Sequence, residues 1–151
     1  MKAGKLMKLR ITTVSPDMTV EQAHGWMLRL GIRHLPVLTE HTLAGIVSDR
    51  DLLLAIGKSS DGQRFVYPQK TVGEVMTLSP RVAGVDVSIS KIARLMVEEK
   101  LDAVPIVSKD NTLLGLLTSS DLLLLLTEMP EETLPAVAYE VRRIDTLPAS
   151  A

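Results

Sequence analysis

Two pairs of a hydroxyl and a carboxylate occupy the same local setting at two places in the chain. Ser48 and Asp51 follow the short apolar stretch that begins at Gly45, and Thr118 and Asp121 follow a similar stretch. A carboxylate accepts strong hydrogen bonds from hydroxyl groups, and the free backbone N–H groups at a helix start favour an anion. These residues are therefore candidates for binding a polar or phosphorylated ligand.

The same spacing also has a purely structural explanation. Ser or Thr followed three residues later by Asp or Glu forms a capping box, in which the two side chains satisfy free N–H groups at a helix start. A capping box needs no ligand. One corner can perform both roles, so binding and capping both stay open.

The two pairs belong to an internal repeat. Asp51 and Asp121 are 70 residues apart, and Pro36 and Pro105 are 69 apart, with one extra residue in the second turn between strands. A fixed period in sequence order and register indicates a duplicated unit. Such a unit is too small to bury a sufficient core alone, so the halves are expected to share one.

Hydrophobic periodicity gives the elements that must position these residues. Thr19 and Gln22 form a capping box that starts a helix, and Gly31 ends it. The first repeat is then predicted to contain strand 11–14, helix 19–30, strands 32–38 and 43–47, and helix 51–56.

These elements predict an α+β fold, in which two β-α-β-β-α repeats pack through their sheets about a pseudo-twofold axis. The first repeat and its connector take residues 1–70, the second repeat takes 71–128, and a C-terminal extension takes 129–151. Within the extension, residues 137–144 could form one short helix or strand.

The composition excludes several classes of protein. The net charge of −1 disfavours a nucleic-acid binder, and the absence of cysteine excludes disulfides and thiolate metal sites. The longest leucine run, 122–126, is far too short to span a membrane, and no signal peptide is recognisable. We therefore expect a cytoplasmic protein.

The repeated strings resemble the CBS domain, and the pair resembles a tandem CBS (Bateman) module. These strings are GIRHLPV at 31–37, GIVSDRDLL at 45–53 and TVGEVMT at 71–77. The resemblance implies a regulatory module that binds AMP, ADP, ATP, S-adenosylmethionine or sometimes a dinucleotide between its repeats. It also implies a homodimer that acts on a regulated protein of unknown identity. Other members bind no ligand and serve only in dimerisation, which is the alternative.

The resemblance also assigns roles to residues of this chain. Asp51 and Asp121 match the carboxylate that accepts hydrogen bonds from the two ribose hydroxyls, and Ser48 and Thr118 match the adjacent hydroxyl residue. The pair Arg33 and His34 matches positions that face phosphates, although basic residues also protect exposed strand edges. Two further polar candidates are Arg50 for the phosphate and Asp102 at the second site. The apolar and small residues expected to contact the adenine are equally compatible with a place in the core. They are Ile32, Leu35, Pro36, Thr13, Val14, Val82, Val104 and Pro105.

The second copy departs from the first in charge. Arg33 and His34 are replaced by Asp102 and Ala103, and Arg50 is replaced by Ser120. A phosphate beside Asp102 would be repelled unless the first repeat supplies cations across the cleft. The first site therefore suits a phosphorylated nucleotide, whereas the second is expected to be weaker, empty, or suited to a positively charged ligand such as S-adenosylmethionine.

No arrangement typical of catalysis is recognisable. The sequence has no glycine-rich phosphate loop, and the three histidines lack zinc-ligand spacing. We therefore expect no enzyme activity, no catalytic cofactor and no metal. The expected partners are an adenosine-containing small molecule, a second copy of the chain and a regulated protein, with no nucleic acid and no membrane.

Overall fold

The structure, a computed structural model, describes residues 1–63 and 65–129 and folds them into two similar halves. Each half contains a helix, a two-stranded hairpin and a second helix. The first half has α2 (Val20–Leu30), β1 (His34–Thr39), β2 (Thr42–Ser48) and α3 (Asp49–Ala55). The second half has α5 (Ile89–Glu99), β6 (Ala103–Val107), β7 (Leu113–Thr118) and α6 (Ser119–Thr127). The predicted α+β fold is confirmed.

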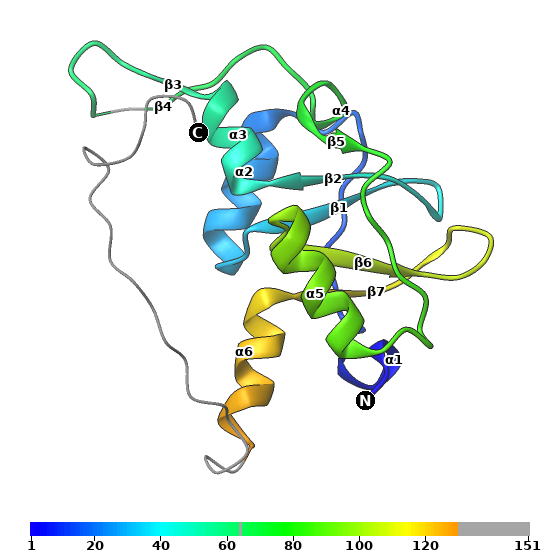
Figure 1. Ribbon diagram of the computed structural model, residues 1–151. Coiled ribbons are helices and arrows are strands. Elements are labelled where there is room, and N and C mark those ends of the chain that lie inside the picture. The colour runs from blue at the N-terminus through cyan, green and yellow to red at the C-terminus, as the bar shows by residue number, and fades with distance from the viewer. Residues whose placement is uncertain (64, 130–151) are drawn as a thin grey trace, which may run out of the picture.

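The hairpins of the two halves lie one above the other, and both turns point away from α2, α3, α5 and α6 (Figure 1). In each hairpin the two strands pair antiparallel. The turns meet where Leu43 N–H donates to the Asn111 carbonyl at 3.2 Å and the Asn111 side-chain amide donates to the Leu43 carbonyl at 3.0 Å. These contacts join equivalent parts of the two halves, as a pseudo-twofold axis requires.

A short leading helix precedes each half and packs on the opposite half. These leading helices are α1 (Ala3–Leu6) and α4 (Val72–Val75). Ala3 N–H donates to the Val87 carbonyl at 2.8 Å, and Val72 N–H donates to the Met18 carbonyl at 2.8 Å. Ala3 is fully buried in the second core and Val72 in the first. The exchange makes each core depend on both halves.

The segment after each leading helix extends the opposite hairpin. β5 (Thr77–Leu78) pairs antiparallel with β2, and Lys8 forms the equivalent bridge to Leu116 in β7. The close approach requires glycine beneath it: a Cβ on Gly115 would meet the Met7 sulfur at 2.6 Å. Both repeats therefore have glycine at this position, Gly45 and Gly115, because a side chain would collide with the neighbouring segment.

Local signals place the helix ends as the sequence predicts. Thr19 and Gln22 form the expected capping box, and Gly31 ends α2 in the left-handed conformation with φ 63°. Lys100 takes the equivalent place after α5 with φ 55°, a conformation that costs a residue with a Cβ more than glycine.

Some predicted boundaries are wrong. The predicted strand 11–14 is only an isolated parallel bridge from Val14 to Val37, because no further residues pair there. β1 begins at His34, two residues later than predicted, and α3 begins at Asp49, directly after its Ser48 cap. The connector contains a small antiparallel ribbon of β3 (Gly57–Lys58) and β4 (Phe65–Val66).

The predicted C-terminal extension lies outside the described residues beyond Met129, including the expected element at 137–144. Within residues 1–63 and 65–129, no helix has both the length and the apolar character needed to cross a bilayer.

Candidate ligand-binding site

A cleft of about 700 Å³, which we call the first cleft, lies between the two halves. The β2–α3 corner and the start of β1 supply one wall. Residues 77–81, which follow the leading helix α4, and the end of α5 supply the other. Six predicted residues line it: Arg33, His34, Ser48, Arg50, Asp51 and Asp102. Their roles in binding stay predictions.

A second cleft of about 190 Å³ is related to the first by the pseudo-symmetry. Each of its lining residues has an equivalent in the first cleft, 69 or 70 residues away. For example, Thr118 corresponds to Ser48, and Lys8 corresponds to Thr77. The starts of β1 and β6 lie between the clefts, so Arg33, His34 and Asp102 line both of them.

The Asp51 carboxylate is held in place by its own capping box. Ser48 donates to Asp51 Oδ2 from its backbone N–H at 2.8 Å and from its hydroxyl at 2.7 Å. In the part of the chain that the structure describes, Asp51 Oδ1 has no hydrogen-bond or ion-pair partner. The corner therefore performs its capping role and still presents an acceptor oxygen at the first cleft.

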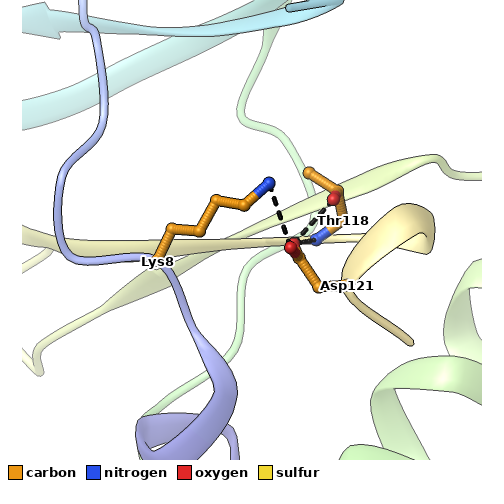
Figure 2. Close-up of polar contacts among 3 residues, drawn as sticks. All are labelled: Lys8, Thr118 and Asp121. Atoms are coloured by element: carbon orange, nitrogen blue, oxygen red, sulfur yellow. Dashed lines mark hydrogen bonds and ion pairs between the residues drawn. The ribbon is translucent and has the colours of Figure 1, made fainter. Parts of the chain in front are cut away.

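The equivalent corner differs in one contact. Thr118 donates to Asp121 Oδ2 from its N–H at 2.8 Å and from its hydroxyl at 2.6 Å, as in the first half. Asp121 Oδ1, however, lies 3.0 Å from the Lys8 ammonium. Figure 2 shows Lys8 reaching from the N-terminal segment to the start of α6. Both oxygens of this carboxylate are thus engaged.

Cations gather at the first cleft from both halves. Arg33 and Arg50 come from the first half, and Arg81 and Lys100 come from the second. Arg81 Nε lies 2.6 Å from a carboxylate oxygen of Glu99, whereas Arg33 and Arg50 form no ion pair with any residue the structure describes. Lys100 likewise forms no ion pair among the described residues, but arginine can bind phosphate through two parallel hydrogen bonds, so Arg33 and Arg50 are the first candidates for a phosphate.

His34 lies partly buried between the two clefts. Burial lowers the pKa of its imidazole below the usual 6.5, because removal from water disfavours the charged ring, and the nearby Asp102 only partly opposes this. His34 is therefore neutral near pH 7 in the unliganded protein. A bound phosphate would shift this pKa upward.

Most of the residues predicted to contact adenine line neither cleft. Leu35, Pro36, Val104 and Pro105 are fully buried, and Val14 belongs to the first core, so their side chains line neither cleft. Consecutive residues of β1 and β6 are buried, so both faces of these strands are covered, which agrees with the core alternative considered above. Thr13 is half-buried, Val82 is exposed, and neither lines a cleft, whereas Ile32 lines the second cleft.

Sequence reasoning missed the contribution of the segment after each leading helix. Thr77, Ser79 and Arg81 line the first cleft, and Lys8, Arg10 and Thr12 line the second. The second cleft thus receives cations from the first half, the condition under which a phosphate could be tolerated beside Asp102. The repeat offset shows that the two segments are equivalent to each other. It does not show that each segment lies against the strand-to-helix junction of the opposite half.

No group of three or more histidine and carboxylate side chains in the described part of the chain is arranged to hold a metal ion.

Comparison with known proteins identifies the family. The CBS domain family matches residues 3–58 and 72–128 of this chain. The chain belongs to the CBS domain family. The CBS pair is 29% identical over 143 residues to the chloroplastic protein CBSX2 of Arabidopsis thaliana. The crystal structure of CBSX2 in complex with AMP has a TM-score of 0.72 at 29% identity, covering 84% of this chain and 96% of that one.

Two further relatives place the pair in different proteins. It is 29% identical over 117 residues to the CBS domain-containing protein YhcV of Bacillus subtilis, covering 77% of this chain and 79% of YhcV. It is 32% identical over 111 residues to inosine-5'-monophosphate dehydrogenase of Korarchaeum cryptofilum, covering 74% of this chain. The CBS pair spans only 21% of that dehydrogenase and 60% of CBSX2, so similarity to the enzyme concerns a small part of it.

Proposed function

We propose that this CBS pair binds an adenosine nucleotide in the first cleft and thereby biases its assembly with a second copy or with a regulated protein. The observation that carries the proposal is the Asp51 carboxylate. One of its oxygens is fixed by Ser48, and the other is available at a 700 Å³ cleft. Volumes of about 300–1,000 Å³ are typical of small-molecule sites.

The charges around the first cleft support a phosphorylated ligand. Asp51 would accept hydrogen bonds from the ribose hydroxyls, and each such charge-assisted bond contributes about 1.5–3 kcal/mol. Arg33 and Arg50, both without a carboxylate partner among the described residues, would bind the phosphate. The AMP complex of CBSX2 supports the choice of an adenine nucleotide as the first ligand to test.

The helices on the outside of the pair favour assembly with a second copy. Leu54 of α3 is 83% exposed, Val97 of α5 is 79% exposed and Leu123 of α6 is 63% exposed. Val97 and Leu123 line an apolar groove between α5 and α6. Exposed apolar patches on helices are typical of protein interfaces. This feature also favours the second candidate function, a dimerisation module that binds no ligand.

A thermal-shift panel separates the two functions. A ligand at about 100 times its dissociation constant stabilises the folded state by about 2.7 kcal/mol. For a domain of this size the melting temperature should then rise by roughly 5–10 °C. The panel contains AMP, ADP, ATP, S-adenosylmethionine and NAD, and each ligand should be recovered unchanged. A melting temperature that none of them shifts would favour the dimerisation module, provided that the chain dimerises in sedimentation and that Leu123→Glu abolishes the dimer.

A further inference from the structure

The two strand-to-helix corners differ in the partner of the carboxylate Oδ1, and of the two carboxylates only Asp51 lines its cleft. In the first, Asp51 Oδ1 has no partner among the described residues, whereas in the second, Asp121 Oδ1 is paired with the Lys8 ammonium at 3.0 Å. The Asp121 side chain is only 10% exposed, and the Lys8 ammonium reaches its carboxylate from the N-terminal segment (Figure 2). A ribose hydroxyl would have to share Asp121 Oδ1 with the Lys8 ammonium, a competitor that Asp51 Oδ1 does not have among the described residues.

The backbone fixes the position of Lys8. Its N–H donates to the Leu116 carbonyl at 2.9 Å, and Leu116 N–H donates back to the Lys8 carbonyl at 3.2 Å. This pairing anchors the lysine to β7, the strand that ends at the Thr118 cap. The equivalent residue in the second repeat is Thr77, which pairs with Ile46 of β2 and has a short, uncharged side chain. The ion pair with Asp121 thus depends on one difference between the repeats, Lys8 in place of threonine.

Displacing Lys8 would be unfavourable for the protein. The ammonium would leave a carboxylate that is nearly removed from water and has no other charged partner in the described chain. The space is also small, since the second cleft encloses about 190 Å³ and small-molecule sites begin near about 300 Å³. Lys8 itself lines this cleft and fills part of it.

We propose that Lys8 closes the second cleft to nucleotides, so that each chain binds one nucleotide, in the first cleft. The inference rests on the proposed function of the first cleft. It makes Lys8 the residue that determines the number of ligands, and it assigns the Asp121 carboxylate to an internal ion pair. Arg10 and Arg33 remain at the second cleft as cations that could face a phosphate once Lys8 is replaced.

Calorimetric titration with AMP tests this proposal through the number of sites. The wild-type chain should bind one AMP, and Asp51→Asn should bind none at concentrations that saturate the wild type. Lys8→Thr, which introduces the residue found at the equivalent position 77, should bind two. The double variant Lys8→Thr with Asp51→Asn should bind one AMP, in the second cleft. The triple variant that also carries Asp121→Asn should bind no AMP. If Lys8→Thr does not fold, as judged by circular dichroism, Lys8→Gln serves in its place.

Each outcome decides between the two proposals. Lys8 variants that still bind a single AMP would contradict the inference, and so would a second AMP bound by the wild-type chain. A wild-type chain that binds no AMP would instead contradict the proposed function. In that case, binding of one AMP by Lys8→Thr would support the role of Lys8. Binding of no AMP by Lys8→Thr would contradict that role.

Discussion

Gly115 lies directly against Met7, so close that a Cβ built on the glycine would meet the methionine sulfur at 2.6 Å and the Lys8 carbonyl oxygen at 3.0 Å. The contact joins the N-terminal segment to β7 in the opposite half. Gly45 and Met76 make the equivalent contact in the other half, also at 2.6 Å. Two glycines that the repeat displays in sequence therefore mark where the halves exchange segments.

Gly115→Ala should destabilise the protein. The added methyl group must displace Met7, and overpacking of this kind costs about 1–3 kcal/mol. Urea unfolding followed by circular dichroism measures the loss. Gly25→Ala is the matched control: nothing lies within 4 Å of its Cβ and it sits inside α2, so it should stabilise by about 0.5–1 kcal/mol. Equal effects of the two substitutions would contradict the packing account.

Val72→Ala should destabilise the first half although the residue lies in the leading helix of the second. Val72 is fully buried in the first core, and removing its two methyl groups should cost about 2 kcal/mol. Val66→Ala, at a position that is 52% exposed, serves as the control. Because the cores share residues, unfolding should follow a single transition by both circular dichroism and Trp26 fluorescence. Separate transitions would show that the halves are independent.

The burial of His34 predicts a pH-dependent stability. Its pKa in the folded state lies below the unfolded value of about 6.5, so the unfolded chain takes up the proton more readily. The contribution of His34 is therefore complete above about pH 6.5 and is lost as the pH falls through its folded pKa. Between about pH 7.5 and 5.5, wild type should lose more unfolding free energy than His34→Gln. An equal or smaller loss in wild type would contradict the assignment.

Lys100→Gly should separate stability from binding. Lys100 has φ 55° and also lines the first cleft. Glycine adopts this conformation without strain, so the substitution should stabilise by up to about 1 kcal/mol. It also removes a cation from the cleft, so AMP should bind more weakly. Melting temperature and calorimetric affinity should therefore change in opposite directions, and a parallel change would contradict this role for Lys100.

Features encoded by neighbouring residues could be predicted from the sequence. The capping boxes at Thr19 and Ser48 and the helix end at Gly31 depend on groups a few residues apart, and the structure contains all three. The internal repeat likewise gave the order of elements and the family. The capping box and the ligand role at Ser48 and Asp51 were indistinguishable in sequence, because both require the same residues at the same spacing.

Features that depend on distant contacts could not be predicted. The strand expected at 11–14 needed neighbours that the fold does not supply beyond Val37. The exchange of leading helices leaves the repeat offset unchanged, so no pattern could reveal that Lys8 faces Asp121 or that Arg81 faces the first cleft. The apolar run at Leu35 and Pro36 predicts a strand, but it does not show whether a residue of that strand contacts the core or a ligand.

The central claim is that Asp51 binds the ribose of an adenosine nucleotide, and the relative affinity for AMP and 2'-deoxy-AMP tests it most directly. Wild type should prefer AMP by about tenfold or more, since a hydrogen bond to a carboxylate contributes about 1.5–3 kcal/mol. Asp51→Asn should weaken AMP binding and make the affinities for AMP and 2'-deoxy-AMP similar. Asp121→Asn should keep the wild-type preference for AMP. Equal affinities in wild type, or an undiminished preference in Asp51→Asn, would contradict the account.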